Sequence, residues 1–343
     1  MKEQDTITND RAVRHKKTIR TITAFIVTLI LLVVVIMLSI NIGTIKVSFP
    51  RMIKGLIFTY DEDVSSIFDL RFPRIAISLL AGAAVAVSGV LFQAVLKNPL
   101  ADPGIIGISS GAGFFAVLVT AFLPTMYFLT PIVACAGGLL AFIMVYTLSW
   151  KGGLSPLRII LVGVAVDALF TGLSNSFNSM SGGNLSGVAS IVNGNITMKT
   201  WDDVGTLFPY VVVGLLLSFA AAASCNLLSL EDHTARSLGI NVNRTRLLLS
   251  FVAVVLAAIS TAIVGSISFL GLIVPHMGRL LVGQDHKKLI PYSMLLGALV
   301  YLAADTIGRT IASPYEISAS IIMSVVGGPF FIIMLRRSKS YGK

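Results

Sequence analysis

The sequence predicts an all-α, polytopic membrane protein with about ten transmembrane helices. Of its 343 residues, 55% are hydrophobic and only 12% are charged, whereas an average soluble domain carries about 25% charged residues. The apolar residues gather in long blocks without charge, and about 20 such residues cross a hydrocarbon layer as a helix. Because backbone groups in lipid must find their hydrogen bonds within the segment, these blocks should be helices. Alternating segments of about ten residues, which would indicate a β-barrel, are absent.

The apolar blocks define the expected spans. Along the chain they are 21–42, 75–96, 105–123, 127–150, 157–180, 207–229, 247–265, 267–283, 289–311 and 317–335. The first is expected to be retained, because no small-residue cleavage site ends it. Pro124 and Pro131 mark a turn inside the uncharged block Pro103–Trp150. The block Leu247–Met277 is short for two crossings, so we expect 267–283 to be a short or irregular helix.

The distribution of lysine and arginine orients the bundle. With the N-terminus in the cytosol, 19 of the 26 Lys and Arg residues fall in inner segments and 7 in outer ones, in line with the positive-inside rule. Both termini are therefore expected in the cytosol. We expect one transmembrane domain over 1–343, with a cytosolic segment at 1–20 and a long inner loop at 230–246. The net charge of +10 does not indicate nucleic-acid binding, because the charges lie in short loops rather than on one basic face.

Motifs for catalysis and metal binding are missing from the sequence. It contains no HExxH, GxSxG or GxxxxGKS/T string, so an ATP-driven system would need its nucleotide site on another chain. The four histidines are scattered, and Cys135 and Cys225 sit in apolar blocks, where cysteine behaves as a small hydrophobe. We expect no catalytic residue, cofactor or metal on this chain.

Charged residues inside the spans are costly in lipid and are therefore candidates for function. Asp167 is the one acid deep in the fifth span. It either lines a pathway or makes a structural hydrogen bond to a neighbouring helix. Asp305 and Arg309 lie four residues apart with the acid first, the spacing that favours an ion pair on one helix.

Two segments between spans favour contacts with partners. Arg71 and Arg74 flank Pro73 at the outer start of the second span and lie on one helical face, as a compact cationic patch. They either extend towards lipid headgroups or dock an acidic partner. The inner segment Glu231–Asn241 predicts a short amphipathic helix that ends near Gly239. It is either a lever for a partner protein or a plain connection.

A set of short strings runs in order along the chain. The strings are Arg71-Phe72-Pro73-Arg74, Gly82, Ser88-Gly89, Gln93, Lys97-Asn98-Pro99-Leu100-Ala101-Asp102-Pro103, Gly107-Ile108-Ser109-Ser110-Gly111-Ala112, Leu161-Val162-Gly163-Val164-Ala165, Thr234-Ala235-Arg236-Ser237-Leu238-Gly239, Phe269-Leu270-Gly271-Leu272-Ile273-Val274-Pro275-His276, Ala304-Asp305 with Arg309, and Gly327-Gly328-Pro329-Phe330. Over roughly residues 40–335, this set resembles the FecCD-type permease family of ABC importers for iron-siderophores, haem and vitamin B12.

The resemblance implies a fold like that of the vitamin B12 importer permease. It implies pairing with a second, identical or different, permease around a central pathway. It also implies two ATP-binding ABC subunits, which carry ATP and Mg, and an extracytoplasmic substrate-binding protein. The chain would lie in the cytoplasmic membrane, in contact with lipid and without a cofactor of its own. The implied cargo is an iron complex, either a ferric siderophore or haem, with cobalamin as the alternative.

Three groups of residues take expected roles from the resemblance. The residues expected to dock the binding protein are Arg71, Arg74 and Arg309, with Asp305 orienting Arg309. The residues expected to couple to the ATPase are Glu231, Asp232, Thr234, Ala235, Arg236, Leu238 and Gly239. The residues expected near the cytoplasmic gate are Asn98 and Leu100, with Ser155 in a second gate element at 153–156.

The chain departs from the family pattern at two places. Where the family usually has Glu-Leu-Pro-x-Gly, this chain has Glu316-Ile317-Ser318-Ala319-Ser320, which predicts a more regular start of the last helix. Asp167 replaces a residue that is usually apolar or small. It keeps an alternative open, an ion-coupled secondary transporter with Asp167 as its site. An intramembrane enzyme is disfavoured, because no paired Ser/His, Asp/Asp or HExxH arrangement is present.

Overall fold

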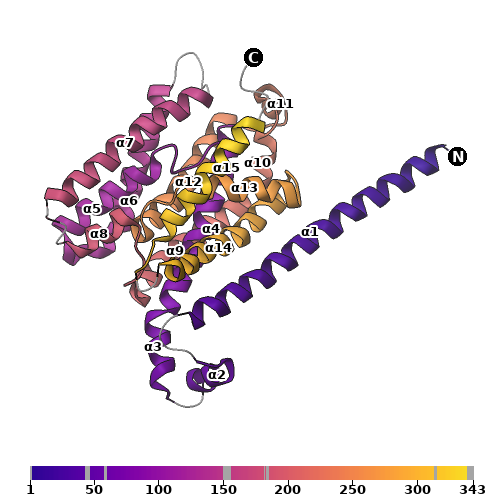
Figure 1. Ribbon diagram of the computed structural model, residues 1–343. Coiled ribbons are helices and arrows are strands. Elements are labelled where there is room, and N and C mark those ends of the chain that lie inside the picture. Colours follow the sequence, from indigo (N-terminus) through magenta and orange to yellow (C-terminus); the bar gives the residue numbers. More distant parts are fainter. Residues whose placement is uncertain are drawn as a thin grey trace.

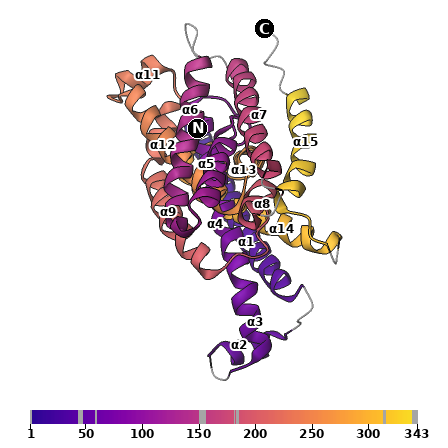
Figure 2. The same cartoon turned by 90° about the vertical axis from the view of Figure 1, so that its left-hand side faces the viewer.

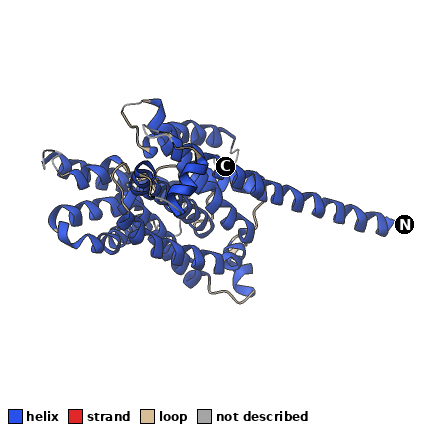
Figure 3. Ribbon diagram, turned by 90° about the horizontal axis from the view of Figure 1, so that it is seen from below, coloured by secondary structure: helices blue, strands red, loops and turns tan. Residues whose placement is uncertain are grey.

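Helices form all the regular structure of the described part of the chain (Figure 3). The computed structural model describes residues 2–42, 47–57, 60–149, 156–180, 182, 185–312 and 315–337. The helices are α1 Lys2–Asn41, α2 Phe49–Ile57, α3 Glu62–Leu70, α4 Phe72–Val95, α5 Ile108–Phe122, the 3-10 helix η1 Pro124–Leu129, α6 Thr130–Ser149, α7 Pro156–Met180, α8 Ser186–Asn193, α9 Trp201–Ala220, α10 Ala222–Leu228, α11 Asp232–Ser237, α12 Val242–Val264, α13 Leu270–Val282, α14 His286–Ile311 and α15 Ala319–Arg337.

The predicted spans correspond in order to α1, α4, α5, α6, α7, α9 continued by α10, α12, α13, α14 and α15. Among the described residues, 7 helices are long and apolar enough to cross a membrane, and α5, α13 and α15 are shorter apolar helices. The all-α membrane fold is therefore confirmed. The short helix expected at 267–283 is also confirmed, because α13 has 13 residues. The turn expected near Pro124 is formed by η1.

Helix α9 begins at residue 201, earlier than the expected span 207–229. Because Asp203 is charged, the prediction did not count this segment as part of the apolar block. In the structure Asp203 stabilises the first turn of the helix. Its carboxylate accepts the backbone N–H of Thr200 at 2.9 Å, and the Thr200 side chain accepts the backbone N–H of Asp203 in return. This capping box satisfies two N–H groups that have no partner within the helix.

Helix α4 is the centre of the bundle and packs against α9, α12, α13 and α14. Two glycine pairs let the backbones touch. A Cβ on Gly82 would lie 2.5 Å from the carbonyl oxygen of Gly297 in α14, and a Cβ on Gly89 would lie 2.0 Å from that of Gly271 in α13. Small residues at helix crossings give the close packing on which association in lipid depends.

Helix α1 slants away from the rest of the bundle (Figures 1 and 3). It is attached mainly to α14, where the Thr28 hydroxyl lies 2.9 Å from the Tyr292 hydroxyl and the ring of Phe25 meets that of Tyr292 edge-on. The other apolar side chains of its membrane-length part are largely exposed. Such a surface suits contact with lipid tails.

The bundle has two ends that differ in what projects from them (Figures 1 and 2). At one end α2 and α3 project beside the first turn of α4. At the other end α11 projects beside the point where α4 stops. We call these the outer and the inner end, after the orientation that the Lys and Arg distribution predicts.

Candidate functional site

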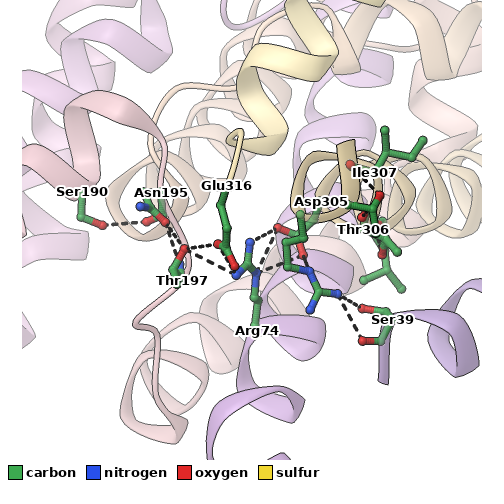
Figure 4. A network of polar contacts seen from close by, with 12 residues as sticks. Ser39, Arg74, Ser190, Asn195, Thr197, Asp305, Thr306, Ile307 and Glu316 are labelled. Carbon is green, nitrogen blue, oxygen red and sulfur yellow. Dashed lines mark hydrogen bonds and ion pairs between the residues drawn. The ribbon is translucent and has the colours of Figure 1, made fainter. Parts of the chain in front are cut away.

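At the outer end, the first turn of α4 places Arg74 among carboxylates (Figure 4). Its Nη2 lies 2.8 Å from Asp305 Oδ1, its Nε lies 3.1 Å from both Asp305 oxygens, and its Nη1 lies 2.8 Å from Glu316 Oε2. The side chains of Arg74 and Asp305 are 7% and 0% exposed. Charge-assisted hydrogen bonds of this forked kind are the strong form of the Arg–carboxylate pair.

Thr197 joins the same group. Its hydroxyl donates to Glu316 Oε2 at 2.6 Å, and its backbone N–H donates to Asn195 Oδ1 at 2.8 Å. We call Arg74, Thr197, Asp305 and Glu316 the outer clamp. They tie together α4, α14, the segment before α9 and the segment before α15.

Glu316 stays ionised within the outer clamp. Burial alone would raise its pKa, but hydrogen bonds from Thr197 and Arg74 and the charges of Arg74 and Arg309 outweigh burial, so that the pKa of Glu316 lies below its usual range. Residues 316–318 remain outside α15, which begins at Ala319. The missing Pro and Gly of the family pattern therefore do not extend the helix into this segment.

Arg309 lies beside the outer clamp. Its Nε is 3.4 Å from Asp305 Oδ2, so the ion pair expected from the four-residue spacing is present. Its Nη2 donates to Ser39 Oγ at 2.5 Å, which connects α14 to α1. Asp305 is nevertheless closer to Arg74 than to Arg309. Asp305 is therefore shared between Arg309, as expected, and a closer partner on another helix that the sequence did not indicate.

The compact patch expected from Arg71 and Arg74 does not form. Arg71 lies between α3 and α4, is half-buried and donates to the carbonyl of Ile40. Arg74 instead turns inward to the outer clamp. The physical reason is that a guanidinium at a buried position requires carboxylate partners. Only the tertiary structure supplies those partners.

A cavity of about 470 Å³ lies beside the outer clamp. Arg74, Asp305 and Glu316 form part of its wall, and residues of α8 and α15 form much of the rest. Polar groups such as Asn193 and Ser324 line it as well. The outer end of the bundle thus holds a hollow with polar walls.

At the inner end, Lys97 follows the last turn of α4 and binds the segment that starts α11. Its Nζ lies 2.8 Å from Asp232 Oδ1 and also donates to the carbonyl of Leu230. Arg246 of α12 reaches the same oxygen at 2.9 Å. The pKa of Asp232 therefore lies below its usual range, chiefly because of the hydrogen bond from Lys97. We call Lys97, Asp232 and Arg246 the inner linkage.

Helix α11 confirms the expected amphipathic helix, although it is shorter than Glu231–Asn241. Gly239, with φ +85°, ends it in the left-handed conformation that glycine adopts without strain. One side chain of the expected coupling set, Ala235, is buried. Those that are exposed are Glu231, Thr234, Arg236 and Leu238, with Asp232 half-buried.

The predicted gate residues Asn98 and Leu100 lie in the loop between α4 and α5, and both are buried. The Asn98 side chain accepts the backbone N–H of Leu100 at 3.0 Å. Gln93 Nε2 holds the loop from α4 through the carbonyl of Ala101 at 3.2 Å. The loop is thus a packed element at the inner end of α4. Ser155 lies outside the described residues.

Asp167 lies where α7 packs against the start of α5. It is half-buried on α7 and lies near the first turn of α5, where the Ser110 hydroxyl donates to the carbonyl of Gly107 at 3.0 Å. α7 passes so close to the start of α5 that a Cβ on Gly107 would lie 2.9 Å from the backbone nitrogen of Asp167. A carboxylate is favoured at a helix N-terminus by the helix dipole. Elsewhere in the described ranges, no three His, Cys, Asp or Glu side chains gather as a metal site.

Sequence reasoning missed Thr197, Glu316 and Lys97 as parts of polar groups. The sequence singled out Glu316 only because its segment departs from the family motif, and Lys97 only as one residue of a family-like segment. The available signal was an arginine at position 74, at the start of an apolar span, because an arginine that becomes buried requires an acidic partner. The sequence does not indicate which acidic residue pairs with Arg74.

Comparisons with known proteins agree with this architecture. The sequence profile of the FecCD transport family matches residues 31–337. The chain is 42% identical over 315 residues to the "Probable heme-iron transport system permease protein IsdF" of Staphylococcus aureus (strain MSSA476), covering 92% of this chain and 96% of that protein. IsdF from strain Newman is 41% identical over the same length.

Two solved structures share the fold. One, a metal-chelate type ABC transporter in an inward-facing conformation, superposes with a TM-score of 0.76 at 30% identity, over 90% of this chain and 97% of that one. The other, PsaBC from Streptococcus pneumoniae in complex with Fab, has a TM-score of 0.55 at 20% identity, over 83% and 95%. The second likeness concerns the fold alone.

Proposed function

The chain belongs to the FecCD transport family, and from this premise we propose that it is the membrane-spanning permease subunit of an ATP-driven ABC importer for an iron complex. The observation that carries the proposal is the match of 92% of the chain to a permease named for haem-iron transport. Haem is the first proposed cargo, a ferric siderophore the second, and cobalamin the alternative. Ion-coupled transport through Asp167 is set aside, because the relatives are permeases of a different transporter class.

In this proposal two permeases enclose the pathway in the cytoplasmic membrane, this chain being paired with a copy of itself or with a different subunit. Two ABC subunits bind ATP and Mg at the inner end, and an extracytoplasmic binding protein delivers cargo at the outer end. Both termini face the cytosol, which the Lys and Arg distribution supports. The chain moves cargo and performs no covalent chemistry.

The inner linkage supports a coupling role for α11. Its exposed Arg236 and Leu238 offer a basic and an apolar contact to an ABC subunit. Asp232 joins this helix to Lys97, which directly precedes the gate residue Asn98. Movement of α11 on ATP binding is thereby passed to the loop between α4 and α5.

Docking of the binding protein on Arg71, Arg74 and Arg309 stays part of the proposal. Arg71 is half-buried and lies beside the projecting α3. Arg74 and Arg309 are only 7% and 9% exposed, so an acidic partner reaches them by displacing a carboxylate already present. Glu316, whose side chain is 36% exposed, is the group that a docking carboxylate can replace.

Reconstitution tests the proposal. The chain is purified with its partner permease and ABC subunits, placed in proteoliposomes, and supplied with the binding protein and haem, a ferric trihydroxamate or cobalamin. We expect haem or the ferric trihydroxamate to accumulate inside with ATP and not with a non-hydrolysable analogue. Accumulation driven by a proton gradient without ATP would contradict the proposal.

A further inference from the structure

The first turn of α13 is held by groups from other parts of the chain rather than by its own helix alone. Pro275 has no N–H, so the carbonyl of Gly271, four residues earlier, lacks the partner that a helix normally provides. Gln93 of α4 donates to this carbonyl through Nε2 at 3.1 Å. Gly89, one turn before Gln93, makes the approach possible, because the two backbones nearly touch there. Gln93 thus replaces the backbone donor that proline removes.

The residue before α13 adds strain to the same turn. Phe269 has φ +66°, in the left-handed region that a residue with a side chain rarely adopts. It lies against α15 where that helix has no room for a side chain, because a Cβ on Gly327 would lie 2.4 Å from the Cβ of Phe269. Strained backbone of this kind persists only where its surroundings hold it, and it is concentrated at segments that switch. The start of α13 is therefore a bend that neighbouring helices maintain.

Gln93 also holds the gate loop, by which we mean residues 96–107 between α4 and α5. The same Nε2 donates to the carbonyl of Ala101 at 3.2 Å, so one buried amide joins this loop to α13. Arg279, in the last turn of α13, donates to Gln93 Oε1. Because Oε1 is the acceptor in this bond, the amide nitrogen is directed at the two carbonyls.

Asp102 lies at the same contact, with its side chain fully buried. Its Oδ1 accepts the backbone N–H groups of Gly104 and Ile105 within the loop, at 2.8 and 3.1 Å. Its Oδ2 would lie 2.9 Å from a Cβ on Gly271, so the carboxylate meets the first turn of α13. A negative charge is favoured at a helix N-terminus. The gate loop and the first turn of α13 are thus packed as one unit.

We propose that Gln93 is a positioning residue of the transport cycle, which makes the gate loop follow the first turn of α13 when α13 bends at Pro275. The inference rests on the proposed function and adds to it a link between the two ends of the bundle. Ser266, three residues before Phe269, lines the cavity beside the outer clamp. The first turn of α13 therefore lies between that cavity and the gate loop, and a bend there reaches both.

A pair of substitutions tests the proposal. Gln93→Met nearly keeps the length of the side chain and removes both donated hydrogen bonds. Pro275→Ala returns an N–H to the carbonyl of Gly271 within α13, so the helix no longer needs Gln93 at this point. Cargo taken up per ATP hydrolysed is measured for each in the reconstituted complex with its binding protein. Gln284→Met, at an exposed glutamine just after α13, is the control.

We expect each single variant to lower uptake per ATP about fivefold while hydrolysis continues. The double variant should be no worse than either single one, because both substitutions act on the same link. The control should equal the wild type. Independent roles would multiply to a loss of about 25-fold. That result, or an unchanged uptake per ATP in Gln93→Met, would overturn the proposal.

Hydrogen exchange supplies a readout that a purely stabilising role would not move. Backbone exchange over residues 96–107 and 268–278 is compared between the nucleotide-free complex and the complex trapped with ATP and vanadate. In the wild type the two segments should change together, and in Gln93→Met only one of them should change. A wild type in which they change independently, or a variant in which exchange rises equally in both states, would overturn the proposal. Wild-type uptake tests the proposed function separately, and the exchange comparison does not depend on the cargo.

Arg279 offers a second comparison where Gln93→Met does not assemble. Arg279→Met frees the Gln93 amide to turn away from the two carbonyls and should lower uptake per ATP as Gln93→Met does. Arg279→Lys keeps a donor for Oε1 and should retain most of the wild-type ratio. Equal ratios for the two Arg279 variants would overturn the proposal.

Discussion

A cation lies at the start of helix α4 and another just past its end, and the two make similar contacts in different surroundings. At the outer end Arg74 pairs with Asp305, which also faces Arg309. At the inner end Lys97 pairs with Asp232, which also faces Arg246. The Asp305 side chain is 0% exposed, whereas that of Asp232 is 40% exposed.

Because of this difference in burial, the ion pair at the outer end should stay formed, whereas the ion pair at the inner end can break and re-form. Breaking a buried ion pair leaves an uncompensated charge away from water, at a cost of about 3–5 kcal/mol. Breaking an exposed pair costs about 0–1 kcal/mol, because water solvates both partners. The outer clamp therefore holds helices in place, and the inner linkage can open and close at little cost. A part that follows ATP-driven movement needs the second property.

The largest effect is expected at the outer clamp. Asp305→Asn removes the charge that faces Arg74 and should destabilise the protein by about 3–5 kcal/mol. Thermal unfolding in detergent measures this loss. The matched control is Asp63→Asn, which breaks an exposed pair with Arg51 and should cost at most about 1 kcal/mol. Equal unfolding temperatures for the two variants would remove the distinction between the buried and the exposed ion pair.

At the inner linkage the main effect is expected on coupling rather than on stability. Asp232→Asn should lower ATP-driven uptake about fivefold, which corresponds to about 1 kcal/mol of coupling energy. ATP hydrolysis by the complex should continue, and the unfolding temperature should barely change. The double variant Lys97→Asp with Asp232→Lys restores the pair and should regain part of the uptake. A parallel fall of hydrolysis and uptake would argue against a coupling role.

A smaller effect is expected where the outer clamp reaches the surface. Thr197→Val keeps the shape of the side chain but removes the hydroxyl that donates to Glu316. The loss should be about 0.5–1.5 kcal/mol of stability. Thr206→Val is the control, because the Thr206 hydroxyl binds only a carbonyl of its own helix. If both variants unfold alike, Thr197 does not contribute to the clamp.

The smallest effect is expected from pH. The pKa of Glu316 is lowered from its ordinary value of 4.5, so its contribution to stability is fully present above that value and is lost as pH falls through the lower folded value. The stability difference between the wild type and Glu316→Gln should be constant from neutral pH down to about pH 5 and shrink below about pH 4. Unfolding temperatures across this range measure it. A difference that grows on acidification would show that Glu316 is not held as an anion.

Much of the fold could be predicted because it depends on local properties of the chain. Apolar blocks predicted the positions of the spans. The shortness of the block Leu247–Met277 predicted that α13 is short, and Gly239 predicted where α11 ends. The pair of Asp305 and Arg309 was predicted because both lie on one helix. The start of α9 was missed because Asp203 acts through its cap rather than through hydropathy.

The sequence by itself determined the membrane-spanning helices, their expected orientation and the local ion pair, because hydropathy and helical spacing act within a single segment. Only the tertiary structure decided that Arg74 belongs with Asp305, 231 residues away, and that Lys97 belongs with Asp232, 135 residues away. It also decided that Asp167 lies beside the first turn of α5. The physical reason is that a charge in a spanning helix takes its partner from whichever helix packs beside it, and this choice depends on the contacts of the whole bundle.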